Sequence, residues 1–363
     1  MTILQEALEN FLNWLQQHRP EYAAYLKPGL TCEQIRQQVE ILPFQLPHEV
    51  FQLYQWRNGT ELDYFLPYYY FLPLEEAIEQ YHVQATMLRQ QKEQLEQYYP
   101  QATMPRDPCN SLNLYWFPIF YEPIEQLFVV GHDEQRDSSP VIYYFGEDGS
   151  SNIFCSNLTT MILTMADCYK TGAYYYMENP NRVLLEEDTI EVARILRQHN
   201  PNLVEDTLTK AKQAYHELSY QKLLEIAYRV RWYKDSRTVE PLIGILQASK
   251  SKNKNSEELH QMQSLAAALL GELNDPGAVS SLIKALQAED WVTRLDAAKS
   301  LGKLGQQRAI APLVNALDDN HELVRNAAAS SLLFGLNAVE PLIEALKSNS
   351  VNVRSLVAQT LGA

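Results

Sequence analysis

Histidine and cysteine, the side chains that most often bind metals or act as nucleophiles, do not cluster in this sequence. The eight histidines never stand at HxH or HxxxH spacing, and the four cysteines form no CxxC pair. Zinc sites and small disulfide frameworks depend on such spacings. The glycine-rich phosphate-binding motifs and the GxSxG nucleophile motif are absent as well. The sequence therefore predicts no catalytic residue, no metal site and no bound cofactor.

The densest group of ionisable residues is acidic and follows His132, between two apolar runs that favour β-strands. Three carboxylates in one loop could bind a cation, but their spacing lacks the EF-hand pattern and its glycine. We therefore interpret the group as a solvated acidic patch that binds a basic protein partner. It consists of Asp133, Glu134 and Asp137, extended by Glu147 and Asp148 in the next turn.

Charge is distributed unevenly along the chain, whose formal net charge is −15. Residues 1–180 hold 9 Lys and Arg against 23 Asp and Glu, whereas residues 181–363 hold 21 against 22. Tyrosine divides in the same way, 18 before and 4 after. The shift predicts a domain boundary near Met177–Arg182. An acidic first domain repels phosphate backbones, so nucleic-acid binding is disfavoured and a basic partner is attracted. The alternative is that the acidity only maintains solubility.

Length and hydropathy indicate a folded protein of more than one domain. The chain has 363 residues, of which 46% are hydrophobic. No run of 18 apolar residues occurs, so no membrane span is expected. Glu6 and Glu9 interrupt the apolar N-terminal stretch, which predicts an amphipathic helix and not a signal peptide. Without a disulfide framework, the expected location is the cytoplasm.

Residues after Tyr220 contain internal repeats. The blocks VEPLIGIL, VSSLIKAL, IAPLVNAL and VEPLIEAL begin at Val239, Val279, Ile310 and Val339. Their leucines, Leu242, Leu282, Leu313 and Leu342, recur after 40, 31 and 29 residues. A second block follows each later copy and carries Arg294, Arg325 and Arg354, with Gln263 in the first copy. Apolar residues at i, i+1 and i+4 form one helical stripe that a single hairpin cannot bury, so the hairpins must stack.

These blocks resemble HEAT repeats of the short-period type found in phycocyanobilin (PBS) lyase subunits of cyanobacteria. The resemblance implies a helical solenoid that binds proteins. It also implies a ladder of aspartates and arginines between repeats, for which a structural role is favoured over a ligand site. The ladder residues are Asp290 with Arg294, Asp319 with Arg325, and Arg354. In the proposed helices, Pro312 and Pro341 fall in first turns, and Gly302, Gly305 and Gly335 at helix ends. The outward face of the last hairpin, near Val353 and Leu356, is expected to be partly exposed and could support self-association.

Residues 1–177 mix helical periodicity with aromatic, β-rich runs, which predicts an α+β fold. Asn58-Gly59 is expected to end a helix over Pro47–Arg57 with a left-handed residue. The other expected helices are Thr2–Gln17, Thr31–Val39, Pro73–Tyr98 and Leu158–Thr171. The expected strands are Tyr64–Leu72, Leu112–Phe120, Gln126–Val130, Val141–Phe145 and Asn152–Cys155.

Several motifs in this first domain occur in a familiar order. Ile41–Glu61 reads ILPFQLPHEVFQLYQWRNGTE, Phe71–Leu74 reads FLPL, and Trp116–Ile119 reads WFPI. In this order they resemble the Knr4/Smi1-like (SUKH) domain from Glu33 to Thr171. The resemblance implies binding and not catalysis, because bacterial members are often toxin-neutralising immunity proteins and fungal members are scaffolds. The match is carried by Trp56, Asn58, Gly59, Trp116 and Pro118, for which core packing or helix capping is expected.

The expected organisation is a Knr4/Smi1-like domain over residues 1–177, a helical connector or lead-in hairpin over 178–219, and a HEAT-repeat solenoid over 220–363. The connector is expected to be helical from Val183 to Leu218. The leading hypothesis is a non-enzymatic bacterial interaction protein, of the immunity or regulatory kind, whose acidic domain binds a basic protein. Two alternatives are a bilin lyase or isomerase subunit linked to phycobilisomes, and a purely structural scaffold.

Overall fold

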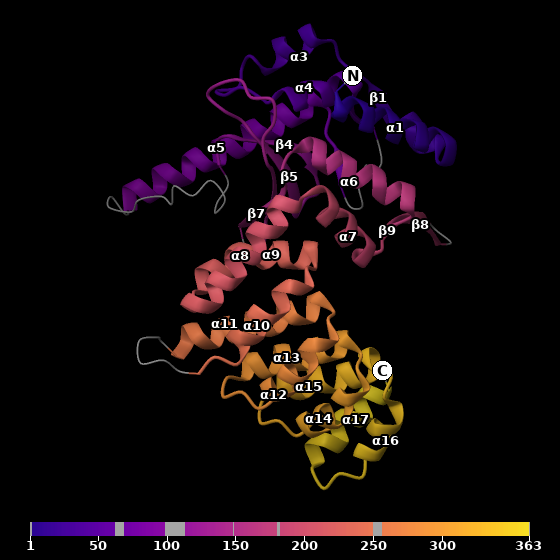
Figure 1. Cartoon of the computed structure of the whole chain (residues 1–363), viewed down its shortest axis with the longest axis vertical. Helices are drawn as coiled ribbons and strands as arrows, with labels where there is room; N and C mark the ends of the chain where they lie inside the picture. Colours follow the sequence, from indigo (N-terminus) through magenta and orange to yellow (C-terminus); the bar gives the residue numbers. More distant parts are fainter. Residues whose placement is uncertain are drawn as a thin grey trace. The chain divides into compact units, whose positions relative to one another are not determined.

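The chain divides into two compact units, Met1–Leu203 and Val204–Ala363. The computed structural model describes residues 2–61, 69–98, 113–147, 149–179, 182–249 and 256–362. The N-terminal unit combines helices with antiparallel sheet, and the described part of the C-terminal unit is helical (Figure 1). This arrangement confirms the expected fold class, an α+β domain and an all-α solenoid. The boundary expected near Met177–Arg182 falls within the N-terminal unit, where two paired antiparallel strands flank it.

A five-stranded antiparallel meander forms the centre of the N-terminal unit. Its order is β3 (Tyr70–Phe71), β4 (Trp116–Tyr121), β5 (Glu125–Val130), β6 (Val141–Phe145) and β7 (Ser150–Cys155). The first five residues of β4 are all buried, which is the pattern of a strand covered on both faces. Two further antiparallel pairs join β1 (Leu26–Pro28) to β2 (Arg57–Thr60) and β8 (Tyr174–Asn179) to β9 (Arg182–Glu187).

Amphipathic helices supply the rest of this core. They are α1 (Ile3–His18), α2 (Pro20–Tyr25), α3 (Cys32–Val39), α4 (His48–Trp56), α5 (Leu74–Tyr98), α6 (Leu158–Thr171) and α7 (Thr189–His199). Helix α1 begins with a capping box between Thr2 and Gln5, and its buried stripe packs against α4 and α6. Helix α5 packs against β4 through its first turns.

Two local expectations for the N-terminal unit differ from the structure, and a third lies partly outside the described residues. Helix α4 ends at Trp56, and Gly59 has its positive φ of 82° inside strand β2, not at a helix end. A β-carbon on Gly59 would collide with the backbone of Pro73, so the glycine allows two segments to approach closely. The helix expected from Val183 is preceded by strand β9, because the apolar run of Val183–Leu185 pairs with β8. Of the strand expected over Tyr64–Leu72, residues 64–68 lie outside the described part of the chain, and Tyr70–Phe71 form β3.

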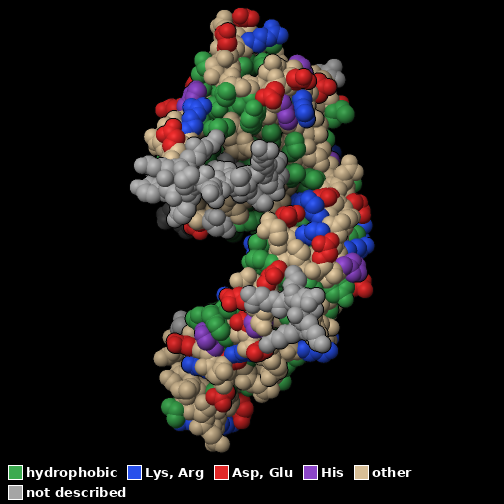
Figure 2. All heavy atoms as spheres, turned by 90° about the vertical axis from the view of Figure 1, so that its left-hand side faces the viewer, with side chains coloured by type: hydrophobic (Ala, Val, Ile, Leu, Met, Phe, Trp, Pro, Cys, Tyr) green, Lys and Arg blue, Asp and Glu red, His purple; other side chains and the backbone are tan. Residues whose placement is uncertain are grey.

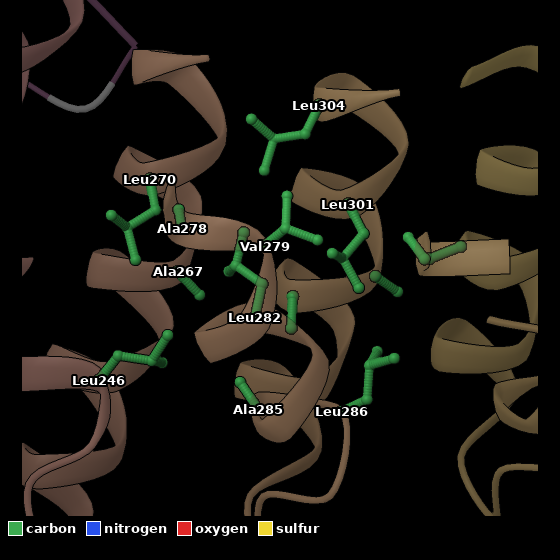
Figure 3. Packing of buried hydrophobic residues seen from close by; sticks show 14 of the residues in the cluster. Leu246, Ala267, Leu270, Ala278, Val279, Leu282, Ala285, Leu286, Leu301 and Leu304 are labelled. Carbon is green, nitrogen blue, oxygen red and sulfur yellow. The ribbon is translucent and has the colours of Figure 1, made fainter. Parts of the chain in front are cut away.

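From Pro201 onward, the described residues form five successive helical hairpins. They are α8 (Pro201–Glu217) with α9 (Tyr220–Tyr233), α10 (Val239–Leu246) with α11 (Ser256–Leu273), α12 (Val279–Ala285) with α13 (Trp291–Leu304), α14 (Ile310–Ala316) with α15 (Glu322–Ser330), and α16 (Val339–Ala345) with α17 (Val351–Gly362). The second helix of each hairpin packs against the second helix of the next. One continuous apolar core results, and Figure 3 shows Val279 and Leu282 of α12 between the helices that carry Leu270 and Leu301.

Small residues set the close spacing of these second helices. Ser300 and Ser331 each donate a hydrogen bond to a carbonyl of the preceding repeat, Ala267 at 2.8 Å and Ala298 at 2.9 Å. A β-carbon on Gly302 would lie 2.5 Å from the Ser331 Oγ. Gly302 is therefore a close-approach residue.

The other predicted glycines and prolines of the solenoid have different outcomes. Of the three glycines expected at left-handed helix ends, only Gly305 has that conformation, with a φ of 60°. Gly335 lies in a π-helical turn, Ser331–Gly335, against the carbonyl of Gly302. The expectation for Pro312 and Pro341 is confirmed, because both stand in first turns.

Candidate functional site

The predicted acidic loop is held in place by its backbone. It follows β5, and His132 exchanges two backbone hydrogen bonds with Gln45, of 2.8 and 3.0 Å. The carbonyls of Arg136 and Asp137 then accept from the first N–H groups of α4, those of His48 and Glu49. These N–H groups have no partner within their own helix, so the loop satisfies them. The carboxylates of the loop are thus presented from a fixed backbone.

Two of the predicted acidic residues come together at a small hollow. Asp133 and Glu134 line a space of about 330 Å³ with Tyr115, His132 and Arg136. The Tyr115 hydroxyl donates a 2.8 Å hydrogen bond to Asp133. Burial and the nearby Arg136 guanidinium lower the pKa of His132, so its imidazole is neutral at pH 7. The hollow therefore presents acidic groups beside a neutral histidine and one guanidinium.

Two of the other predicted acidic residues, Asp137 and Glu147, lie elsewhere. Among the described residues, Asp137 and Glu147 do not line this hollow, and Asp148 falls outside the described part of the chain. Asp137 contributes its carbonyl to α4, and Glu147 lies in the turn between β6 and β7. Of the four predicted residues that the structure describes, Asp133 and Glu134 therefore line the hollow and Asp137 and Glu147 do not.

Glu49 is a buried carboxylate that no sequence motif singled out. It is 7% exposed and accepts from the backbone N–H of Thr159 at 2.9 Å, from that of Leu158 at 3.3 Å, and from the Thr159 hydroxyl. Burial raises the pKa of Glu49, and the hydrogen bonds from Thr159 oppose that rise. The carboxylate caps the start of α6 and ties it to α4, which is also hydrogen-bonded to the acidic loop.

The residues that carry the Knr4/Smi1 resemblance have packing and capping positions. Asn58 is buried; its side chain accepts from the N–H of Leu74 at 2.8 Å and donates to Glu75 at 3.1 Å, so it caps α5. Trp56 is buried at the end of α4. Trp116 packs on Phe128 and Ile142, and Pro118 stands in β4 opposite Phe128. The membership of this domain in that family stays a prediction.

Of the three arginines of the predicted ladder, Arg294 alone bonds to a neighbouring repeat, and its partner is Asp319 and not the expected Asp290. Its guanidinium donates to both carboxylate oxygens of Asp319, at 2.8 and 3.0 Å, 25 positions along the chain. It also donates to the carbonyls of Ala288 and Glu289 in its own turn. Asp290, expected beside Arg294, instead caps α13 by accepting from the N–H of Thr293. An N-cap aspartate uses its oxygens on its own helix, which explains the change.

The remaining ladder positions clamp the turn of their own repeat. Arg325 donates to the carbonyls of Asp319 and Asn320, and Arg354 to those of Ser348 and Asn349. Gln263 makes the equivalent bonds to Leu246 and Ala248. The recurring polar residue thus stabilises the connection between the two helices of a hairpin.

The pairing most suggestive of catalysis in the described residues has no activated nucleophile beside it. His199 Nε2 lies 2.7 Å from Asp167 Oδ2, and Cys168 follows Asp167. Burial raises the pKa of the Cys168 thiol to about 12, with Glu187 and Asp167 adding to the rise. Such a thiol stays protonated, whereas a nucleophilic cysteine needs a lowered pKa. In the parts of the chain that the structure describes, no group of three His, Cys, Asp or Glu residues could hold a metal ion.

The expected exposure of the last hairpin is not found at Val353, which is 4% exposed, and Leu356 is half-buried. Val353 packs into the common core of the unit. The more exposed apolar residues there are Ile343 and Val351. In addition, none of the described helices combines the length and hydropathy that a membrane span requires.

The stacked hairpins define the C-terminal unit as a helical-repeat solenoid. Its sequence identifies the type of repeat. Residues 254–333 match the family model of HEAT repeats. This segment, which includes α11, α12, α13, α14 and α15, consists of HEAT repeats. No curated protein matches the chain.

Two solved structures resemble the chain at low identity. One is the complex of CpcE and CpcF of phycocyanin lyase from Nostoc sp. PCC7120, with 22% identity, a TM-score of 0.30, and coverage of 42% of this chain and 63% of that chain. The chain thus spans less than two-thirds of that protein. The other is an engineered protein, with 17% identity, a TM-score of 0.32, and coverage of 56% and 90%.

Proposed function

We propose that this protein is a non-enzymatic interaction protein whose N-terminal unit binds a basic protein partner. The observation that carries the interaction role is the HEAT-repeat array of the C-terminal unit, because stacked helical hairpins serve widely as extended binding surfaces. The choice of the N-terminal unit and of a basic partner depends on charge. In that array, Arg294 joins two repeats through Asp319, whereas Arg325 and Arg354 stabilise the turns of their own repeats.

Charge supports the choice of partner. Residues 1–203 carry 12 Lys and Arg against 27 Asp and Glu, a net charge of −15, and residues 204–363 carry 18 of each sign. On the face that Figure 2 displays, acidic and basic side chains are interspersed over the C-terminal unit. A large net charge on one unit speeds encounter with oppositely charged proteins. Asp133 and Glu134, presented from the anchored loop, are the first contacts that we assign to that partner.

The test is capture of the partner with the full chain from the native host, identification by mass spectrometry, and measurement of its affinity as a purified protein. The variant Asp133→Asn/Glu134→Gln should weaken binding several-fold. Glu6→Gln/Glu9→Gln on the exposed face of α1 makes the same charge change elsewhere and is the control. Affinity should also fall between about 50 and 200 mM salt, since screening weakens exposed charge pairs. An affinity that changes neither in the Asp133→Asn/Glu134→Gln variant nor with salt would refute the assignment of these two residues as partner contacts.

The immunity form of the hypothesis, implied by the Knr4/Smi1 resemblance, has a separate test. Co-expression with toxins encoded by neighbouring genes should relieve the toxicity of one of them. The purely structural alternative predicts no captured partner and no rescue.

A bilin lyase or isomerase subunit is the competing function, supported by repeat spacings of 31 and 29 residues. Mixing the full chain with a phycobilin and an apo-phycobiliprotein tests it directly. A coloured covalent adduct would support the lyase hypothesis, and its absence would remove it.

A further inference from the structure

Helix α5 has two opposite faces with different environments. One face is buried, through Ala77, Tyr81 and Ala85, and Tyr81 donates from its hydroxyl to the Leu114 carbonyl at 3.1 Å. Gln84 adds a 2.6 Å hydrogen bond to Gln126 of β5. These contacts fix the helix against the sheet. Its rotation is therefore set, and so is the face that it turns outward.

The outward face carries apolar side chains without cover from the described residues. Val83 and Met87 are 45% and 57% exposed and stand one helical turn apart. They line a shallow hollow of about 670 Å³, together with Glu75, Glu79, His82 and Gln90. The exposed surface of this hollow is mostly apolar. Isolated exposed apolar residues are ordinary on proteins, but neighbouring ones along a hollow mark an interaction surface.

The charged groups at this hollow have one sign. Glu75 and Glu79 lie at its start, and no lysine or arginine is among its described lining residues. Glu75 is held by the Asn58 side chain, so its carboxylate has a defined position. An apolar strip with carboxylates at one end is complementary to a partner that offers apolar side chains and a cation.

We infer that the outward face of α5 docks an amphipathic basic helix of a partner protein. The inference rests on the proposed function and names one surface for it. A helix suits the hollow better than a strand, because α5 offers side chains one turn apart and no unpaired backbone groups along its middle. Side chains at i and i+4 of the partner lie between Val83 and Met87, and methionine adapts its shape to them. Lysine or arginine of the partner pairs with Glu79.

The experiment uses the full chain and a designed probe. The probe is a fluorescein-labelled helical peptide of about 16 residues, roughly four turns, with leucines at i, i+3, i+4 and i+7 flanked by lysines. A second peptide has glutamate in place of every lysine. Fluorescence anisotropy should show binding of the lysine peptide, with the glutamate peptide at least about tenfold weaker.

Matched variants locate the site. Val83→Ser/Met87→Gln should weaken binding of the lysine peptide about tenfold or more, as expected for central apolar contacts. Ile41→Ser/Ile190→Ser changes residues that are 61% and 60% exposed elsewhere on the unit, and should leave binding unchanged. Glu79→Gln should reduce the salt dependence of binding, whereas Glu9→Gln in α1 should not. All four variants change exposed positions, and circular dichroism checks that they stay folded.

The outcomes separate this inference from the proposed function. Failure of the lysine peptide to bind, or binding that Val83→Ser/Met87→Gln does not weaken, overturns the α5 site. If Asp133→Asn/Glu134→Gln weakens binding of the lysine peptide and Val83→Ser/Met87→Gln does not, the proposal of a basic partner is supported but α5 is not its binding site. Equal binding of both peptides overturns the charge complementarity on which the inference depends.

Discussion

Arg294 and Arg325 occupy equivalent positions in successive repeats but make different hydrogen bonds. Arg294 binds both oxygens of Asp319 and two carbonyls of its own turn, whereas Arg325 binds only carbonyls. Lysine cannot reproduce the planar fork of arginine. Arg294→Lys should lower the free energy of unfolding by about 2–4 kcal/mol, since it leaves a half-buried carboxylate poorly paired. Arg325→Lys, the matched control, should cost about 1 kcal/mol. Urea unfolding followed by circular dichroism measures both, and equal losses would contradict a special role for Asp319.

The same pair predicts a pH dependence. Burial opposes ionisation of Asp319, but hydrogen bonds from Arg294 and from the backbone N–H of His321 outweigh it and lower the pKa of that carboxyl. A carboxyl whose pKa is lower in the folded state contributes stability above its unfolded pKa of about 3.9, and this is lost as the pH falls through the folded pKa. Asp319→Asn should be less stable than the unaltered protein at pH 7. The two free energies of unfolding should converge below about pH 4. Curves that stay parallel from pH 7 to pH 2 would show that Asp319 is not the responsible group.

The sequence predicted the positions at which polar side chains recur in the repeats, but it did not predict their hydrogen-bond partners. The period placed Arg294 and Arg325 correctly as repeat positions, because both serve the same turn. The partner of Arg294 lies 25 positions away and depends on how far one repeat is displaced from the next, which spacing alone does not give. Glu49 was missed for the same reason, since its contacts with Thr159 span 110 positions.

At the scale of elements, the packing of α13 against the π-helical turn that follows α15 depends on a missing side chain. A β-carbon on Gly302 would meet the Oγ and Cβ of Ser331. Although alanine favours helix, Gly302→Ala should lower the free energy of unfolding by about 1–3 kcal/mol, the usual cost of overpacking. Gly362→Ala is the control, because a β-carbon added there would have no atom within 4 Å and α17 should gain slightly.

A double variant makes this test sharper. Ser331→Gly removes the two atoms that Gly302→Ala would strike, at the cost of the hydrogen bond to the Ala298 carbonyl. The two changes together should therefore cost less than the sum of their separate costs. If the losses in free energy of unfolding were strictly additive, the added methyl group of Gly302→Ala would not be clashing with Ser331.

The sequence predicted helices correctly where only one side of the element is buried. Examples are α10, α12, α14 and α16, whose apolar stripe recurs in each repeat. The prediction failed at Val183–Leu185, because a short apolar run suits a strand as well as a helix and the choice depends on the tyrosine-rich strand beside it. Gly59 was assigned to a helix end because the glycine of Asn-Gly readily adopts a positive φ, and a helix cap and an irregular strand can both require one. Among the candidate site residues, Asp133 and Glu134 were predictable as a loop pair. The hollow they share with Tyr115 required the tertiary structure.

For the molecule as a whole, the two compact units have separate apolar cores and different net charges. Each has a variant that acts within it alone. Arg294→Lys removes contacts of the C-terminal unit, and Asn58→Ala removes the cap of α5 in the N-terminal unit. Calorimetry of the full chain should show two transitions, as is usual for proteins with more than one domain.

The variants assign these transitions. Arg294→Lys should lower one midpoint by on the order of 5–10 °C and leave the other in place, given a unit of this size. Asn58→Ala, with an expected cost of about 1–2 kcal/mol, should lower the other midpoint by roughly 3–6 °C. Arg325→Lys should shift the same transition as Arg294→Lys, but less. If either variant moved both midpoints together, the units would unfold as one cooperative body, and partner binding by the N-terminal unit should then stabilise the HEAT repeats as well.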